Sequence, residues 1–420
     1  MKKAILLFAF LGIFFSSFSQ QNKPNYDESK IPPYTLPDPL IFNDGSKVKS
    51  KEEWPKRRAE IFTAFQNEVY GVAPEWKGEL TSSELSSDPH ALNNKAVRRE
   101  VKIILQNGTK ELNFTLLIYL PQSSKPVPVF LAYNFGGNHT VTDEPGISIT
   151  SSWMQNDKEN GITENKATEA GRGKSASQWQ VNEIISRGYG LVTLYYGDID
   201  PDFDDGFLNG VHGLYNQKPG PVSWGSISAW AWGLSRVMDW IETDASIDAR
   251  RVIVMGHSRL GKTSLWAGAT DKRFAIVISN NSGCGGAALS KRIYGETVKT
   301  INTAFPHWFC DNFNKYNDNE PALPVDQHEL LALIAPRPVY VASAEEDQWA
   351  DPKGEFLSCV NVSPVYELLG CKSFPVKEMP AVNSPVTGDI GYHIRTGGHD
   401  VKLYDWQRYL DFADLHFKKK

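Results

Sequence analysis

The feature that most limits the possible folds is an alternation of strand-like and helix-like runs in the second half of the chain. Apolar runs suited to buried strands lie at residues 190–196, 252–255, 275–278 and 339–341. Runs with apolar residues at helical spacing lie between and after them, at residues 227–241, 263–269 and 404–417. Such alternation predicts an α/β fold, in which helices cover both faces of a mostly parallel sheet.

The first part of the chain predicts an extended arm followed by the start of the sheet. Residues 20–53 begin as a polar, proline-rich stretch, which indicates an arm rather than a packed element. Trp54 to Tyr70 has apolar residues at helical spacing and ends at Gly71, so we expect a helix there. Further runs predict successive strands at residues 101–105, 114–120 and 127–133, which fit an antiparallel start to the sheet. No later stretch resembles a linker, so we expect residues 54–420 to form one domain that acts as a monomer.

The first 19 residues have the composition of a secretory signal peptide. Lys2 and Lys3 precede an apolar run from Ala4 to Phe15, and small residues at positions 16–19 lead to Gln20. This apolar run is well short of the roughly 20 residues that span a bilayer. We therefore expect cleavage near residue 19 and a periplasmic or secreted protein with no membrane association.

The charge balance argues against a nucleic-acid partner. The chain has 44 Lys and Arg against 49 Asp and Glu, a net charge of −5. Removal of residues 1–19 takes away two lysines, which leaves 42 basic against 49 acidic residues and a net charge of −7. A protein that grips phosphate backbones needs an excess of basic residues. Nucleic acid is therefore not an expected partner.

The cysteines give no sign of a metal site. The chain has four of them, Cys284, Cys310, Cys359 and Cys371, and no Cys-x-x-Cys pair. Their spacing does not match a zinc site, so structural disulfides or inert buried thiols are the two expected states. The metalloprotease pattern His-Glu-x-x-His is also missing from the chain. We expect no metal and no cofactor.

Two segments interrupt the regular alternation. Residues 138–177 are long and polar and lie between two predicted strands, which is typical of a functional or disordered loop. We expect this insertion to border the substrate cleft. Residues 198–205 contain five aspartates, but they fail the calcium-loop pattern because the required Gly and closing Glu are missing. A solvated loop is the expected state of this acidic segment.

The strongest chemical signal is a strand that runs into a tight turn and then a helix, at residues 251–262. Such an elbow presents the hydroxyl of Ser258 at the edge of the sheet, and the helix N-terminus offers N–H groups to an oxyanion. Leu260 occupies the second small position of the usual Gly-x-Ser-x-Gly pattern, and Gly261 follows one residue later. The context predicts a nucleophilic Ser258, with a structural turn as the alternative.

A nucleophilic serine needs a base and an orienting acid. In α/β-hydrolases these follow in the order Ser, acid, His. His399 lies in a glycine-rich loop before the last helix and fits the base, with His393 as its nearest rival. The acid is expected after the strand at residues 339–341, where the candidates are Glu345, Glu346, Asp347 and Asp351. Asp347 is slightly favoured as the acid because its short side chain lies just beyond the strand.

Two cations follow the predicted nucleophile closely. The backbone N–H of Arg259 is placed to face an oxyanion, and its guanidinium could reach the same charge. Lys262 lies one helical turn after Ser258, on the same face of the helix. The alternative for both residues is a surface salt bridge.

Five short motifs follow one another along the chain: Gly256-His-Ser-Arg-Leu-Gly-Lys262, Asn280-Asn-Ser-Gly-Cys-Gly-Gly286, Gly295-Glu-Thr297, Glu346-Asp-Gln-Trp-Ala-Asp-Pro352 and Gly397-Gly-His399. Together they resemble bacterial glucuronoyl esterases of carbohydrate esterase family 15. The resemblance extends from about Trp54 to the C-terminus. It implies an α/β-hydrolase fold and cleavage of the ester between 4-O-methyl-glucuronic acid on xylan and lignin alcohols.

The resemblance also assigns roles to residues. It implies Ser258 as nucleophile, His399 as base and Arg259 as the oxyanion stabiliser. The residues that match sugar-contacting positions of the family are Lys262, Glu296 and Trp349. Fungal members and some bacterial ones carry a Glu where this chain has Asn281, so the resemblance favours Asp347 as the acid.

Two other functions are compatible with the sequence. A different polysaccharide esterase, such as a xylan acetyl esterase, would keep the same Ser, His and Asp. A non-catalytic glycan-binding protein on the same fold would bind the ligand without hydrolysis. For a glucuronoyl esterase, the expected partner is a substrate, either glucuronoxylan or a lignin-carbohydrate ester.

Overall fold

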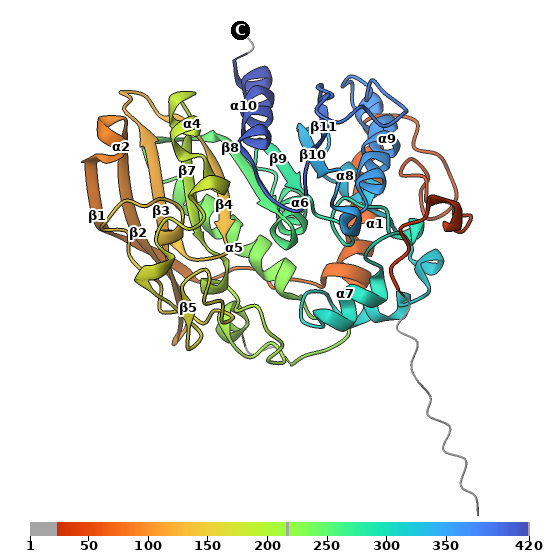
Figure 1. Cartoon of the computed structure of the whole chain (residues 1–420). Coiled ribbons are helices and arrows are strands. Elements are labelled where there is room, and N and C mark those ends of the chain that lie inside the picture. Colours follow the sequence, from red (N-terminus) through yellow and green to blue (C-terminus); the bar gives the residue numbers. More distant parts are fainter. Residues whose placement is uncertain (1–22, 216–217, 419–420) are drawn as a thin grey trace, which may run out of the picture.

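A nine-stranded sheet forms the centre of the protein, as seen in a computed structural model that describes residues 23–215 and 218–418 (Figure 1). The strand order is β1-β2-β3-β7-β4-β8-β9-β10-β11. The strands are β1 Glu79–His90, β2 Ala96–Asn107, β3 Lys110–Pro121, β4 Val127–Asn134, β7 Gly190–Tyr195, β8 Ile247–His257, β9 Ile276–Asn280, β10 Val339–Ala344 and β11 Ile390–Arg395. In this order, the pairs from β1 to β7 are antiparallel and the pairs from β7 to β11 are parallel. The predicted antiparallel start is therefore found for β2 and β3, whereas β4 is parallel to both of its neighbours. The predicted mostly parallel α/β fold is confirmed.

Helices cover both faces of this sheet. They are α1 Trp54–Phe65, α2 Ala91–Asn94, α3 Ala176–Trp179, α4 Val181–Ser186, α5 Ser226–Ile241, α6 Arg259–Thr270, α7 Val298–Ala304, α8 Gln327–Ala332, α9 Pro352–Leu368 and α10 Leu403–Phe417. Alternate residues of β4 point to opposite faces: Val129 and Leu131 pack with α1, α5, α6, α8 and α9, and Phe130 and Ala132 pack with α3, α4 and α10. Both faces are therefore buried, as parallel sheets require.

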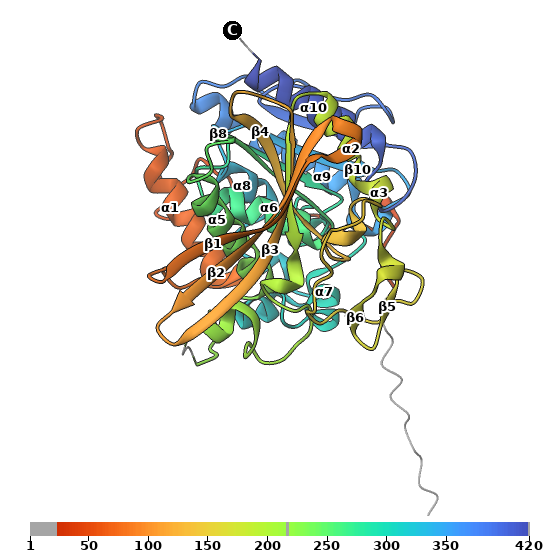
Figure 2. The ribbon, with the colours of Figure 1, turned by 90° about the vertical axis from the view of Figure 1, so that its left-hand side faces the viewer.

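The predicted helix at residues 54–70 is confirmed, because α1 continues as a wider turn over Gln66–Tyr70. It ends at Gly71, whose φ of +80° is in the left-handed region, and a Cβ there would lie 2.4 Å from the carbonyl oxygen of Ser223. β1 was not predicted. It is a mostly exposed edge strand of polar residues, so it has no apolar run that could reveal it (Figure 2).

The insertion at residues 138–177 is folded and holds a small hairpin of β5 Ile162–Thr163 and β6 Lys166–Ala167. The acidic segment that follows β7 is buried in its first part, so the prediction of a solvated loop is wrong for Asp198, Asp200 and the Asp202 side chain, whereas Asp204 is exposed. Asp198 is 9% exposed and Asp200 is 3% exposed. Thr150 of the insertion donates a 2.8 Å hydrogen bond to Asp198, which ties the two segments together.

All four cysteines are free thiols, and three of them, Cys284, Cys310 and Cys359, are buried. Of the two expected states, the structure therefore has thiols rather than disulfides. The predicted signal peptide at residues 1–19 lies outside the described residues. Among the helices of residues 23–215 and 218–418, none has the length and apolar character needed to cross a membrane.

Candidate active site

Ser258 lies at the tip of a sharp elbow between β8 and α6. Its backbone angles are φ 58° and ψ −129°, a strained conformation for a residue with a side chain. A Cβ on Gly256 would lie 1.8 Å from the carbonyl oxygen of Leu260, so the turn requires glycine there. The side chain of Leu260 is buried in the core, and Gly261 lies close to the end of β9. This packing explains why the second glycine of the pattern stands at 261.

His399 and Asp347 meet beside this elbow. Nδ1 of His399 lies 2.6 Å from Oδ2 of Asp347, and the amide of Asn281 donates a 2.7 Å hydrogen bond to the same oxygen. The His399 side chain is 41% exposed, whereas that of Asp347 is 5% exposed. Burial alone would raise the pKa of the Asp347 carboxyl, but the contacts with His399 and Asn281 outweigh it and hold the pKa below its ordinary value. Asp347 is therefore ionised and fixes the orientation of the imidazole.

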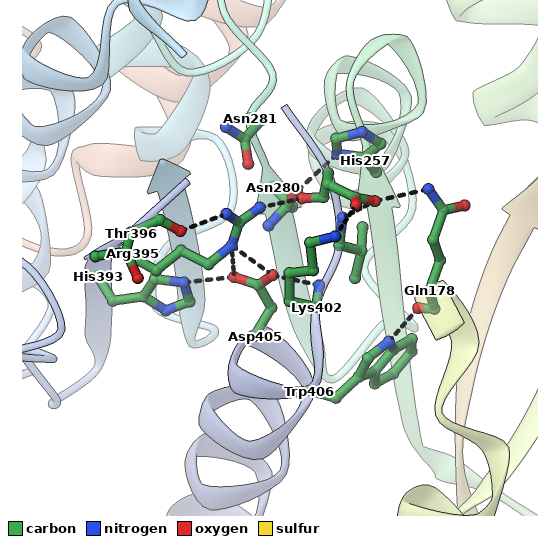
Figure 3. A network of polar contacts seen from close by, with 12 residues as sticks. Gln178, His257, Asn280, Asn281, His393, Arg395, Thr396, Lys402, Asp405 and Trp406 are labelled. Carbon is green, nitrogen blue, oxygen red and sulfur yellow. Dashed lines mark hydrogen bonds and ion pairs between the residues drawn. The ribbon is translucent and has the colours of Figure 1, made fainter. Parts of the chain in front are cut away.

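Arg395, at the end of β11, supports the loop that carries His399. The Arg395 guanidinium donates to the carbonyl oxygens of Thr396, Gly398 and Asp400. Figure 3 shows the same guanidinium against Asp405 of α10, which it contacts at 2.8 Å. The rival base, His393, is fully buried in this support, where its ring contacts Asp405 at 2.8 Å and Tyr340 at 3.0 Å.

The other candidate acids lie elsewhere. Glu346 is exposed and Glu345 half-buried, and their backbone N–H groups donate to the carbonyl oxygens of Gly397 and Arg395. These bonds join the loop of Asp347 to the loop of His399. Asp351 caps the start of α9, where it accepts from the Gly354 N–H at 3.0 Å and from Arg292 at 2.8 Å.

His257 lies next to His399. Its ring lies 4.5 Å from that of His399, and its Nδ1 lies 2.6 Å from Oδ1 of Asn280. Burial, reinforced by the neighbouring His399, lowers the pKa of His257 to about 4. His257 is therefore neutral near pH 7 and adds no positive charge beside His399.

Arg259 does not form a surface salt bridge. Its guanidinium pairs with Asp202, whose side chain is 5% exposed, and it lies 4.8 Å from the ring centre of Trp308. Asp202 also accepts from His307 at 2.8 Å, from Trp308 at 2.7 Å and from the Tyr196 hydroxyl at 2.9 Å. Burial would raise the pKa of Asp202, but these partners outweigh it and hold the pKa far below its ordinary value. The acidic segment thus fixes the guanidinium of Arg259.

Lys262 and Glu296 form a buried ion pair at the same site. Lys262 Nζ donates to the carbonyl oxygen of Ser282 at 2.6 Å and lies 3.8 Å from Glu296 Oε2. Their side chains are 5% and 7% exposed. Burial raises the pKa of Glu296, and Lys262 opposes that shift. Trp349, whose carbonyl accepts from the Glu296 N–H at 3.0 Å, is 39% exposed at the rim.

These residues line one cavity of about 290 Å³. The lining residues are Ser258, Arg259, Lys262, Asn281, Ser282, Gly283, Glu296, Phe305, Trp308, Asp347, Trp349, Ala350 and His399. All seven predicted site residues are therefore in one place. No residue of the insertion at 138–177 is among these lining residues, so the expected border with the cleft is not found at this cavity. Thr150 of the insertion contacts Asp198 in the acidic segment that also holds Asp202.

Three residues at this site were not predicted from the sequence: Phe135, Asp202 and Trp308. Phe135 begins the loop after β4, the strand next to β8, and its ring lies 5.8 Å from the Arg259 guanidinium. In α/β-hydrolases the loop at this place supplies an N–H to the oxyanion. The pair Gly136-Gly137 directly after a buried strand was the signal that could have identified it.

Glu355 of α9 supports the floor of the cavity. It is fully buried and accepts from the N–H groups of Ser282 and Gly283 at 2.8 and 3.0 Å and from the Ser343 hydroxyl at 2.6 Å. Burial raises the pKa of this carboxyl from 4.5 to about 7, against the effect of its hydrogen bonds. The protein therefore holds a proton there that the unfolded chain releases at lower pH.

Replacement of Glu355 by Gln is expected to remove a pH dependence of stability. Because the folded pKa is raised, Glu355 makes wild type lose stability as the pH rises from about 4.5 through about 7. Gln cannot ionise, and it mimics the protonated acid. The difference in free energy of unfolding between E355Q and wild type should therefore shift in favour of E355Q by about 2 kcal/mol from pH 5 to pH 8. Urea unfolding at both pH values measures this; the same difference in the exposed control E346Q would contradict the assignment.

No group of three or more His, Cys, Asp or Glu side chains is arranged to hold a metal ion in the parts of the chain that the structure describes. The groups that line the cavity are instead those of acyl transfer: a hydroxyl, an imidazole held by a carboxylate, and fixed cations.

Comparison with known proteins agrees with this geometry. Residues 180–370 match the family model described as glucuronyl esterase, fungi. The chain is 51% identical over 405 residues to "Carbohydrate esterase MZ0003" from an unknown prokaryotic organism, covering 95% of this chain and 93% of that protein. It is 30% identical over 347 residues to a 4-O-methyl-glucuronoyl methylesterase of Schizophyllum commune, covering 80% of this chain and 74% of that protein.

Solved structures give the same result. A glucuronoyl esterase from Solibacter usitatus superposes with a TM-score of 0.87 at 46% identity, covering 93% of this chain and all of that one. A promiscuous esterase of carbohydrate esterase family 15 from a marine bacterial metagenome superposes with a TM-score of 0.89 at 50% identity, covering 94% and 100%. The chain therefore belongs to the glucuronoyl esterase family, carbohydrate esterase family 15.

Proposed function

We propose that this protein is a serine esterase that cleaves the ester between (4-O-methyl-)glucuronic acid of glucuronoxylan and lignin alcohols. The observation that carries the proposal is the buried Lys262–Glu296 pair in the same cavity as Ser258. A fixed cation and carboxylate suit the hydroxyl and ring oxygens of a sugar acid, whereas a small acyl group such as acetate needs neither. Trp349 at the rim offers a face on which a sugar ring can stack.

The reaction we infer has two acyl-transfer steps. His399, oriented by Asp347, takes the proton of Ser258 as the hydroxyl attacks the uronoyl carbonyl. The tetrahedral oxyanion is stabilised by the guanidinium and N–H of Arg259, aided by an N–H of the loop at Phe135. His399 then gives the proton to the leaving alcohol. Water, deprotonated by the same imidazole, attacks the acyl-enzyme, and the imidazolium returns the proton to Ser258 as the glucuronic acid leaves.

Asp202 serves this step by holding Arg259 still. The guanidinium is braced by a buried carboxylate and by the aromatic face of Trp308, so it does not need to reorganise when the oxyanion forms. The carboxylate and the cation largely neutralise each other in the resting site, which limits the cost of burying either charge.

A broader polysaccharide esterase is the second candidate. The observation in its favour is that one relative of known structure, at 50% identity, is described as promiscuous. An enzyme of that kind would keep Ser258, His399 and Asp347 but would not depend on Lys262 and Glu296. A non-catalytic glycan-binding protein is disfavoured by the strained elbow at Ser258, which binding alone does not require.

The experiment that tests the proposal compares two esters. The mature protein should hydrolyse benzyl glucuronate with a higher kcat/KM than 4-nitrophenyl acetate, although the acetate has the better leaving group. A well-folded protein without activity on the uronate ester would exclude the proposed function. Faster cleavage of acetylated xylan than of benzyl glucuronate would establish the second candidate instead.

Replacement of Lys262 by Ala is expected to change the preference between esters. Loss of a charged hydrogen-bond partner of the sugar should lower kcat/KM for benzyl glucuronate by roughly 10- to 100-fold, with a much smaller loss on 4-nitrophenyl acetate. The ratio of the two values corrects for any loss of folded protein. The exposed Lys299, which pairs with Asp318, gives the control K299A. Equal losses on both esters in K262A would remove the sugar-binding role.

We further infer that residues 1–19 direct secretion and that the mature enzyme is a single-domain monomer. The apolar run and the small residues before Gln20 support cleavage at this point. N-terminal sequencing of the exported protein tests the cleavage site, and light scattering of the purified enzyme tests its mass.

A further inference from the structure

The N-terminal arm contacts the two loops that carry Glu296 and Trp349. We call residues 25–30 the arm segment; it contains a short 3₁₀ turn, Glu28–Lys30, capped by Asp27. The carbonyl oxygen of Asn25 accepts a 2.9 Å hydrogen bond from the Gly295 N–H. The Tyr294 hydroxyl oxygen lies 3.2 Å from the carbonyl oxygen of Tyr26, and the two rings meet edge to face with centres 6.1 Å apart.

Glu28 completes a network of four charges behind the same loops. It pairs with Arg292 and lies 2.8 Å from Lys353. Arg292, whose side chain is 3% exposed, donates from Nε to Asp351 at 2.8 Å. Arg292 and Asp351 lie on different loops, so the guanidinium joins them, and Glu28 covers the outer side of that guanidinium. A buried cation of this kind is favourable only while its carboxylates stay in place.

The two loops are also closely joined to each other. The Tyr294 hydroxyl donates to the side-chain oxygen of Gln348 at 2.6 Å, and the Glu296 N–H donates to the carbonyl of Trp349. Gly295 has a φ of +62°, and a Cβ there would lie 2.5 Å from the Trp349 carbonyl oxygen. Loops packed this tightly transmit a displacement of one to the other.

We propose that the arm segment is a positioning element of the sugar pocket. It holds the loop of residues 292–296 against the loop of residues 348–351, and so fixes Glu296 and Trp349 for a uronate substrate. Glu28 is its main positioning residue, because it closes the charge network of Arg292 and Asp351. The inference rests on the proposed sugar-binding roles of Glu296 and Trp349. Ser258 and His399 lie on other loops, and Asp347, which directly precedes residues 348–351, is held separately by Asn281 and His399, so we expect acyl transfer itself not to need the arm segment.

The test uses E28Q in the full mature chain, with E28D as the conservative variant and K30A as a control on the same segment. The Lys30 side chain is 74% exposed and forms its ion pair with Asp27 of the same segment. In E28Q, KM for benzyl glucuronate should rise roughly 5- to 20-fold with kcat little changed, because the sugar-contacting groups lose their fixed position. kcat/KM for 4-nitrophenyl acetate should stay within about twofold, and E28D should recover part of the affinity.

A second measurement does not depend on activity. Hydrogen exchange at the amides of Gly295 and Glu296 should speed up by about tenfold or more in E28Q and remain as in wild type in K30A. Unchanged KM and unchanged exchange would overturn the inference, as would equal losses on both esters, which indicate a merely structural role. If wild type itself failed on benzyl glucuronate, the proposed function would fall, and the exchange result would still decide whether the arm segment holds these loops.

Discussion

Replacement of Ser258 by Ala is expected to lower kcat for benzyl glucuronate by roughly 10⁴-fold or more, since no other group can form the acyl-enzyme. The change removes one hydroxyl at the elbow and keeps a Cβ, so the backbone there keeps its conformation. The thermal unfolding temperature should therefore stay close to that of wild type or rise slightly. Steady-state kinetics and a fluorescent fluorophosphonate, which labels wild type but not S258A, measure the effect.

The same variant separates an enzyme from a binding protein. S258A should still bind glucuronic acid, because Lys262, Glu296 and Trp349 are untouched. Ser264, on the same helix, is buried in the core, where its hydroxyl oxygen lies 2.7 Å from the carbonyl oxygen of Ile278 and 2.9 Å from that of Gly261. It offers no accessible nucleophile, so S264A should keep the fluorophosphonate reaction. Fluorophosphonate labelling of S258A equal to that of wild type would place the nucleophile elsewhere.

The part of the site that sequence could predict is the part encoded by local pattern and chain order. Ser258 follows a buried strand and begins a helix, and His399 stands in a glycine-rich loop before the last helix. Both signals lie within about ten residues of the side chain concerned. The parallel sheet then brings the carboxyl ends of β8 and β10 and the loop after β11 to one edge, so Ser258, Asp347 and His399 meet there without further information.

What could not be predicted depends on partners far away in the chain. The run of aspartates at 198–205 predicts solvation when its composition alone is considered, yet Asp202 is buried because its partners are Arg259, 57 positions away, and His307, 105 positions away. The prediction of an unpacked N-terminal arm is wrong for Glu28 for the same reason, because Glu28 contacts Arg292, 264 positions away. From sequence alone, a charged residue is predicted to be exposed, because a buried charge needs a partner and a distant partner is visible only in the tertiary structure.

Replacement of Asp347 by Asn is expected to lower kcat by roughly 10³- to 10⁴-fold, because the amide no longer stabilises the imidazolium that forms during the reaction. Asn is nearly isosteric, and the pKa of Asp347 already lies below its ordinary value, so the variant loses the charge but little packing. Glu346 is exposed and belongs to the same loop, which makes E346Q the matched control. Steady-state rates on benzyl glucuronate should fall in D347N and stay within about twofold in E346Q. Full activity of D347N would transfer the role of the acid to a neighbouring carboxylate.

The neighbouring Asn281 allows a sharper version of this test. Its amide nitrogen lies 2.7 Å from the Asp347 oxygen that contacts His399, so a longer acidic side chain at 281 can reach the imidazole from the same side. The double variant D347N/N281E should therefore recover tenfold or more of the rate lost in D347N, because it restores a carboxylate beside Nδ1. N281Q in the same background has similar length without the charge and should recover nothing. Recovery by both variants, or by neither in well-folded protein, would show that His399 depends on something other than an adjacent negative charge.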